Sequence, residues 1–245
     1  MQTPPSELAA RLIRANAAPV TVASAYAMQK VELRLSDDPS LATRVIRLLP
    51  AALARDVTDD VLAHRELARL TPARPLSAFR PGPAAAAAKL RRWYAEGRRR
   101  SGVSWQVLAA VNFVESDFGR MREASVAGAQ GPMQFMPSTW ASYGRGDVHD
   151  PHAAILAAAR FLRAAGAPPP AAFRGRSSPP GVGGSAADAA SGRERGALYR
   201  YNPSRAYVDA VERYAGRIRR SPRAFAQYYA RPLVVRTPAG YRRLE

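Results

Sequence analysis

One glutamate, Glu115, stands in an otherwise largely apolar stretch of the sequence, AAVNFVESDFGRM at residues 109–121. If Ser104 is the N-cap of a helix, Glu115 falls on the same face as Leu108 and Val111, at the spacing of a buried surface. The apolar surroundings and the negative end of the helix dipole both favour the protonated carboxyl. A carboxyl kept neutral near neutral pH is suited to general acid catalysis, in which it protonates a leaving oxygen. The periodicity fits equally well with an exposed glutamate at a frayed helix end.

Two later stretches combine polar side chains with aromatic and sulfur-containing ones. The stretch AGAQGPMQFMPSTWASYG contains Met133, Gln134 and Phe135 after a turn bracketed by glycines. An amide beside soft apolar surface suits a sugar, whose faces are apolar and whose edges carry hydroxyl groups. The alternative is a stripe of methionine and aromatic residues that belongs to the core. The stretch LYRYNPSRAY places Tyr201 and Asn202 just before a helix, where the tyrosines could serve packing alone.

The elements that must position these residues are mostly helices, because helical periodicity recurs along most of the chain. The fold class expected is therefore mainly α, with a short hairpin around Pro238–Gly240 near the C-terminus. Residues 167–196 are rich in Pro, Gly, Ser and Ala, a composition that does not build a core, and they are expected to form a flexible insertion. The expected parts are a helical N-terminal extension (1–70), a linker (71–83), a helical domain (84–220) with a flexible insertion (167–196), and a C-terminal tail (221–245).

The composition narrows the classes of chemistry. The chain has no cysteine, which excludes disulfides, thiolate zinc sites and cysteine nucleophiles. With three histidines and no evident cluster of ligands, we expect no metal site and no cofactor. The net charge of +18 comes almost entirely from arginine and favours polyanionic partners, such as nucleic acid or an anionic cell wall. No apolar run is long enough for a transmembrane helix, and the first residues lack the pattern of a signal peptide.

Taken together, the stretches VESDFGRM, AGAQGPMQFMPSTW and YRYNPS resemble three ordered motifs of the soluble lytic transglycosylase (SLT) family. The family pattern is Glu-Ser, then Gly-x-x-Gly-Leu-Met-Gln, then Ala-Tyr-Asn, and the resemblance covers roughly residues 84–220. The family is part of the lysozyme-like superfamily, which also holds goose-type lysozymes, and the long insertion and arginine–alanine bias resemble its actinobacterial branch. The resemblance implies a lysozyme-like helical domain that cleaves the MurNAc–GlcNAc β-1,4 bond of peptidoglycan.

The resemblance also assigns the chemistry to individual positions. Glu115 corresponds to the catalytic acid and base, and Ser116, which follows it as in the family pattern, is assigned to the substrate-binding set. Tyr201 is implied to hydrogen-bond near the catalytic carboxyl, and Asn202 to hold that turn.

The second motif is implied to bind the glycan. Met133 and Gln134 would line the glycan cleft, with Phe135 in the same substrate-binding set and the Gln134 amide contacting the sugar. The chain departs from the family pattern at Pro132, where leucine is usual, and at Arg200, where alanine is usual. Both departures put the detailed contacts with the sugar in doubt, whereas neither touches the acid.

Two enzymatic mechanisms differ in the number of carboxylates that they need. An inverting hydrolase needs a second carboxylate about 6.5–9.5 Å from the acid, with room for a water molecule. A lytic transglycosylase needs only one, because the muramoyl 6-hydroxyl replaces the water. We favour the transglycosylase over a goose-type hydrolytic muramidase, since Asp150 reads as an N-cap and Asp147 as a turn residue. Glu123 is the one remaining candidate.

A third hypothesis belongs to another class, a basic cell-wall or nucleic-acid-binding protein without catalysis. Runs such as Arg98–Arg100 would be its footprint, but the arginines are dispersed and no nucleic-acid motif accompanies them. We therefore expect peptidoglycan strands as the partner, an anionic wall as a further contact, no nucleic acid, and a monomer. The expected location is the cell envelope or the extracellular space, although this sequence begins without a visible signal peptide.

Overall fold

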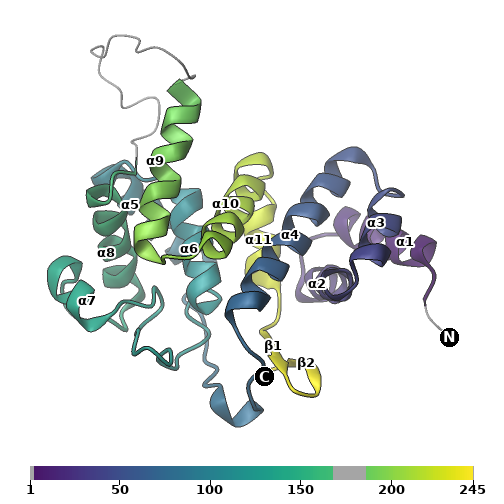
Figure 1. Ribbon diagram of the computed structural model, residues 1–245, viewed down its shortest axis with the longest axis horizontal. Coiled ribbons are helices and arrows are strands. Elements are labelled where there is room, and N and C mark those ends of the chain that lie inside the picture. Colours follow the sequence, from purple (N-terminus) through teal and green to yellow (C-terminus); the bar gives the residue numbers. More distant parts are fainter. Residues whose placement is uncertain (1–2, 168–185, 245) are drawn as a thin grey trace. The chain divides into compact units, whose positions relative to one another are not determined.

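The computed structural model describes residues 3–167 and 186–244, and these residues are mainly helical, as the sequence predicted (Figure 1). The elements in chain order are α1 (Pro5–Ala17), α2 (Val22–Asp37), α3 (Pro39–Ile46), α4 (Ala51–Leu70), the 3-10 helix η1 (Leu76–Ala78), α5 (Ala87–Ser101), α6 (Trp105–Ser116), α7 (Pro137–Tyr143), α8 (Pro151–Ala164), α9 (Ala186–Tyr201), α10 (Arg205–Arg220), α11 (Ala224–Ala230), β1 (Val234–Thr237) and β2 (Gly240–Arg243).

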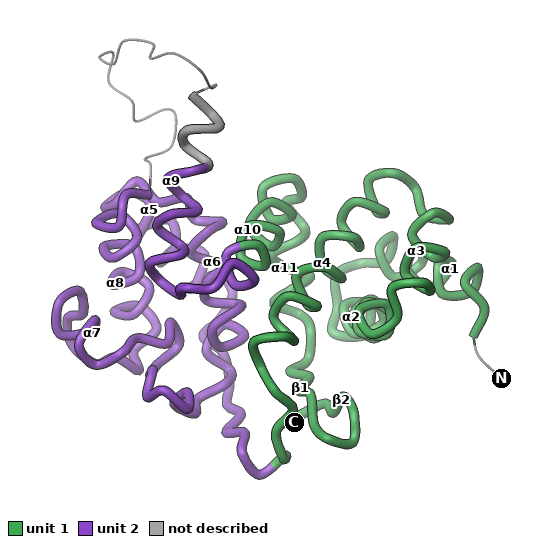
Figure 2. The backbone as a smooth tube through the Cα atoms, in the orientation of Figure 1, with its two compact units in different colours: residues 1–76, 209–245 green, residues 77–208 purple. Residues whose placement is uncertain are grey.

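The chain divides into two compact units, unit 1 (residues 1–76 and 209–245) and unit 2 (residues 77–208), coloured separately in Figure 2. The first division falls inside the predicted linker. The second falls inside α10, earlier than the boundary expected at residue 220. The later part of α10 groups with unit 1 because Arg213 and Arg220 pair with Asp59 of α4, at 3.2 and 2.5 Å.

Unit 1 is a helical assembly that also includes the C-terminal segment. Helix α1 packs against α2 and α3, and α2 packs in addition against α4 and α11. Thr21 and Ser24 form a reciprocal capping box at the start of α2, and Asp38 caps α3. The predicted tail at 221–245 contains α11 and the hairpin, whose register pairs Thr237 with Gly240. The hairpin predicted around Pro238–Gly240 is therefore confirmed.

A cluster of charged side chains is buried in unit 1. Asp60 of α4 is 2% exposed, and its carboxylate binds the guanidinium groups of Arg217 and Arg231, the latter at 2.7 Å. The Tyr228 hydroxyl donates to the other oxygen of Asp60 at 2.5 Å. Arg231 also binds Glu32 of α2 at 2.6 Å. Charges removed from water require such partners, so these contacts fasten α2, α4, α10 and α11 to one another.

Unit 2 is centred on helix α8, which contacts α5, α6, α7 and α9. Helices α5, α6 and α8 pack against one another, while α7 and α9 each pack on α8 (Figure 1). Gly97 permits the close approach of α5, because a Cβ there would lie 2.8 Å from Leu108 of α6 and 3.3 Å from Ala159 of α8. Asp150 accepts hydrogen bonds from two N–H groups at the start of α8 and confirms the predicted N-cap. The candidate acid, Glu115, lies in the last turn of α6.

The flexible insertion predicted at 167–196 is contradicted over its second half. Residues 186–196 belong to helix α9, whereas residues 168–185 lie outside the described part of the chain. Alanine favours helix, and the sequence AADAA at the start of α9 supplies several alanines that outweigh the neighbouring glycine and serine. Ala167, at the first position of the predicted insertion, is buried.

Candidate active site

Helix α6 carries the candidate acid at its C-terminal end. The Ser104 hydroxyl accepts a hydrogen bond from the Val107 N–H and caps the start of the helix, as predicted. All residues from 107 to 112 are buried, so packing fixes the rotation of the helix about its axis. Glu115 follows in the last turn and remains partly exposed.

The backbone reverses directly after this carboxyl. Asp117, Phe118 and Gly119 have φ angles of 50°, 63° and 86°, all in the left-handed region. For a residue with a Cβ this conformation costs roughly 1–2 kcal/mol. Phe118 is held in it because its ring is fully buried and stacks on Phe113, with 5.2 Å between the ring centroids. Strain that packing holds in place is typical of functional sites.

Ser116 fastens this reversal to the second motif. Its fully buried hydroxyl donates to the carbonyl oxygen of Pro132 at 2.6 Å and accepts from the Gly119 N–H at 2.8 Å. Both roles use the side chain inside the protein, so the prediction that Ser116 contacts substrate is wrong and its role is to position the chain. Pro132, which stands where the family pattern has leucine, contributes a carbonyl and does not need the N–H that it lacks.

The electrostatics of Glu115 agree with the expectation from the sequence. Burial raises the pKa of its carboxyl from the usual 4.5 to about 7. The Tyr207 hydroxyl donates a hydrogen bond to Oε1 at 2.7 Å and lowers the pKa, but this effect is smaller than that of burial. Both protonation states of Glu115 are therefore populated near neutral pH, so one group can give a proton and take it back.

Tyr201 lies near the catalytic carboxyl, as the resemblance implies, since burial and then the charge of Glu115 raise the pKa of its hydroxyl. Its hydroxyl donates to the main-chain oxygen of Met133 at 2.6 Å, so Tyr207 is the residue that hydrogen-bonds to Glu115. The two tyrosine rings are stacked, with 6.5 Å between centroids and 4° between planes. In the sequence, the spacing of Tyr207, Val211 and Tyr214 indicates only a shared packing face, and nothing in that spacing marks the Tyr207 hydroxyl.

The second motif forms a tight turn whose side chains alternate between core and surface. Met133 and Phe135 are buried, which contradicts the prediction that their side chains line a glycan cleft. Gln134 is partly exposed with a φ of 46°, and its amide donates to the Gly131 carbonyl oxygen at 3.0 Å. Met136 is 40% exposed. The alternation therefore presents Gln134 and Met136, and the sequence analysis did not include Met136 among the site residues.

Asn202 directly follows helix α9, which ends at Tyr201. Its N–H donates to the Leu198 carbonyl oxygen at 3.0 Å, and its own carbonyl oxygen accepts from the Ser204 N–H at 2.7 Å. The residue is partly exposed. Both contacts are made by the backbone, so the role of the Asn202 side chain in holding the turn stays a prediction.

The other candidate carboxylates each bind backbone N–H groups. Glu123 accepts from the Arg80 N–H at 3.1 Å, and Asp147 accepts from the His149 N–H at 2.9 Å. Asp150 is occupied as the N-cap of α8. All three carboxylates therefore stabilise loops or a helix end through hydrogen bonds from the backbone.

Within residues 3–167 and 186–244, no group of three or more His, Cys, Asp or Glu side chains is placed to hold a metal ion. In the same residues no helix combines the length and the apolar character needed to span a bilayer.

Unit 2 is thus a helical domain, and its candidate site contains a glutamate, Glu115, whose carboxyl has a pKa of about 7. Residues 93–167 match the family model described as the Transglycosylase SLT domain, so this segment is similar to that family. The match contains the first two motifs, while Tyr201, Asn202 and Tyr207 lie beyond its end. No curated protein and no solved structure matches the chain.

The hydrogen bond from Tyr207 gives a test of how Glu115 is tuned. In Tyr207→Phe the pKa of Glu115 should rise further, because the lost hydrogen bond stabilised the carboxylate. The alkaline limb of kcat/KM for glycan cleavage should then move to higher pH, since the acid stays protonated longer. Tyr199→Phe is the matched control, because Tyr199 is 48% exposed on α9. An unchanged limb in Tyr207→Phe would show that this contact does not set the protonation of Glu115.

Proposed function

We propose that unit 2 is a peptidoglycan lytic transglycosylase that cleaves the MurNAc–GlcNAc β-1,4 bond with Glu115 as its single acid and base. The observation that carries the proposal is a carboxyl with a pKa of about 7 at the end of α6, inside the segment that matches the SLT domain. A glutamate side chain fully exposed to water would be ionised near pH 7 and could not protonate a glycosidic oxygen.

The proposed reaction uses Glu115 twice. The protonated carboxyl first donates its proton to the glycosidic oxygen, and the bond to the muramoyl C1 breaks. The carboxylate then removes the proton from the 6-hydroxyl of the same muramoyl residue, whose oxygen bonds to C1 and closes a 1,6-anhydro ring. The N-acetyl group of the substrate can stabilise the intermediate, as in substrate-assisted glycosidases. Tyr207 keeps the carboxyl aimed through both steps.

Side chains on the exposed side of the site have the chemistry to bind a sugar. The Gln134 amide and the Asn202 amide can hydrogen-bond to hydroxyl and acetamido groups. Met136 offers exposed apolar surface next to Gln134 and suits the face of a sugar ring. Tyr201 is placed to support Tyr207 and the second motif, through its stacked ring and its bond to the Met133 carbonyl.

The hydrolytic muramidase reading is less well supported. Glu123, Asp147 and Asp150 are the carboxylates that could activate water, and each accepts a backbone N–H instead. The tethered 6-hydroxyl also has an effective-molarity advantage over water. A protein that only binds the cell wall or nucleic acid does not need a carboxyl whose pKa is raised to about 7, so the pKa of Glu115 favours an enzyme. We further propose a monomer that acts in the cell envelope or outside the cell, where peptidoglycan lies.

The product decides between the two enzymatic readings. Digestion of purified sacculi by the full chain should release muropeptides that end in 1,6-anhydro-muramic acid, each lighter by one water than a lysozyme product, as measured by mass spectrometry. Glu123→Gln should give the same product at a similar rate, because Glu123 holds the Arg80 backbone and takes no part in the reaction. Reducing-end muramic acid, suppressed by Glu123→Gln, would identify the chain as a hydrolase.

A further inference from the structure

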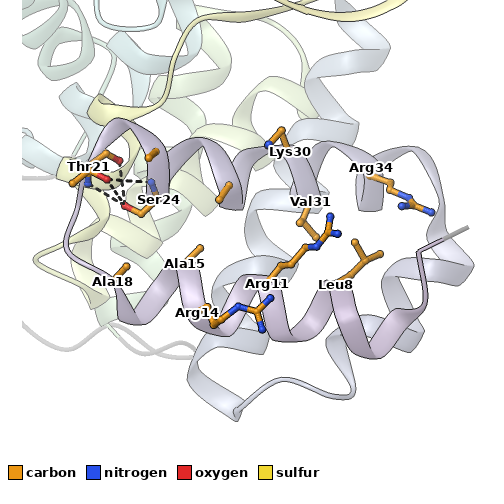
Figure 3. A pocket seen from close by; sticks show the side chains of 12 residues that line it. Leu8, Arg11, Arg14, Ala15, Ala18, Thr21, Ser24, Lys30, Val31 and Arg34 are labelled. Carbon is orange, nitrogen blue, oxygen red and sulfur yellow. Dashed lines mark hydrogen bonds between the residues drawn. The ribbon is translucent and has the colours of Figure 1, made fainter.

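Unit 1 contains a groove between helices α1 and α2, which we call the α1–α2 groove (Figure 3). The hollow has a volume of about 660 Å³. Arg11 and Arg14 line it from α1, and Lys30 and Arg34 line it from α2. Spacings of three and four residues place each pair on one side of its helix, so four cations border one concave surface.

The charge of the groove is unbalanced. Its twelve lining residues, all of them described, include no aspartate or glutamate. Arg11 has a carboxylate partner in Glu7, at 2.5 Å, but Glu7 lies outside the lining. Arg14 and Lys30 are exposed. Several cations with no lining anion attract a negatively charged ligand.

The floor of the groove is apolar and is built from small and medium-sized side chains. Leu8, Ala15 and Val31 are buried and form part of the hydrophobic core of unit 1. The remaining lining residues are the alanines Ala18, Ala23 and Ala27 and the hydroxyl residues Thr21 and Ser24. A ligand that uses the whole groove therefore carries negative charges together with small apolar groups.

This combination distinguishes between classes of ligand. No aromatic side chain lines the groove, so bases of a nucleic acid would have no surface on which to stack. A flat lipid surface does not fit a concave site. A phosphodiester polymer would use the cations but not the apolar floor. A short acidic peptide with methyl side chains uses both.

We propose that the α1–α2 groove binds the acidic, alanine-containing peptides that are attached to the glycan strands of peptidoglycan. Carboxylates of the peptide bind Arg14, Lys30 and their neighbours, and its methyl groups lie on the floor. This partner rests on the proposed function, because peptidoglycan supplies these peptides. The chain then has two contacts with its substrate, one with the peptide in unit 1 and one with the glycan in unit 2.

The test is direct binding of a fluorescent wall peptide, released from sacculi by an amidase, to the full chain. Arg14→Gln/Lys30→Gln should weaken binding on the order of fivefold, as expected for the loss of two exposed charge contacts. Arg44→Gln/Arg47→Gln removes the same charge from exposed positions outside the groove and should leave binding unchanged. The same peptide with its carboxylates amidated should bind weakly to every variant, and salt should weaken the binding of the native peptide.

Two further probes make the result decisive. Vesicles of anionic phospholipid and a soluble polyphosphate should lose no more binding with Arg14→Gln/Lys30→Gln than with Arg44→Gln/Arg47→Gln, because both pairs remove the same charge. The proposal is overturned if the peptide does not bind, if both double variants lose binding equally, or if only vesicles or polyphosphate respond to the groove substitutions. Because the peptide contains no glycosidic bond, its binding is independent of cleavage. Anhydro products without peptide binding would uphold the proposed function and reject the groove, and the reverse result would do the opposite.

Discussion

Glu115→Gln is expected to lower the rate of glycan cleavage at least about a hundredfold, the lower end of what a general acid usually contributes. The glutamine has almost the same shape and can still accept the hydrogen bond from Tyr207, but it cannot supply an acidic proton. The measurement is release of soluble muropeptides from sacculi by equal amounts of folded protein. Glu123→Gln serves as the control that removes a carboxylate from the same unit, and its rate should stay close to that of the wild type. If Glu115→Gln retained most of the activity, the catalytic role would have to move to another residue.

The same substitution has a stability signature that does not depend on activity. The pKa of Glu115 is raised from 4.5 to about 7 in the folded state, so the folded state holds the proton more tightly than the unfolded state. This contribution to stability is fully present below pH 4.5 and is lost as the pH rises through 7. Glu115→Gln, which cannot ionise, should therefore melt at a higher temperature than the wild type at about pH 8, and the difference should shrink toward about pH 5. An equal difference at both pH values would mean that the carboxyl is not desolvated.

Asp60→Asn is expected to destabilise unit 1 by about 3–5 kcal/mol, because it leaves buried arginines without their main counter-charge. Arg217 is 1% exposed and Arg231 7%, and Glu32 then remains as their other buried acidic partner. The free energy of unfolding in urea measures the effect. Asp59→Asn is the matched control, since Asp59 also binds two arginines but is 17% exposed, and it should cost at most about 1 kcal/mol.

The effect of Asp60→Asn should also depend on pH in a defined direction. Burial alone would raise the pKa of Asp60, but Arg217, Arg231 and the Tyr228 hydroxyl together lower it below its usual 3.8. The stability that Asp60 contributes is therefore present above pH 3.8 and is lost as the pH falls through the lowered pKa. The difference between wild type and variant in the free energy of unfolding should decline in strong acid. A small and pH-independent difference would contradict the assignment of this cluster as a main support of unit 1.

Local sequence signals predicted those features whose causes are local. The caps at Ser104 and Asp150, the helical periodicity and the C-terminal hairpin were all readable from neighbouring residues. The raised pKa of Glu115 followed from the apolar face of its own helix. The prediction that residues 186–196 are flexible was wrong, because it gave more weight to glycine and serine than to the alanines. In the structure these residues form part of helix α9.

Features that depend on distant residues were missed for one physical reason. Tyr207 and Glu115 are 92 residues apart, and the spacing within α10 shows which residues are buried but not what their polar atoms meet. The buried pair of Asp60 and Arg217 spans 157 residues and is hidden in the same way. In the second motif, the left-handed turn at Gln134 decides which side chains face inward, and a list of residue types does not contain that information.

Because both ends of helix α6 are fixed, the direction of the Glu115 carboxyl depends on the length of the helix. Ser104 sets where the helix begins, and the left-handed residues from Asp117 onward set where it stops. Each residue added to or removed from an α-helix rotates everything that follows by about 100° and shifts it by about 1.5 Å. One insertion between the cap and Glu115 would thus point the carboxyl away from Tyr207 without changing any residue of the site. Proteins that share this chemistry should therefore keep the number of residues between the N-cap and the catalytic glutamate constant. Insertions should be tolerated only outside this helix, where they do not rotate the glutamate.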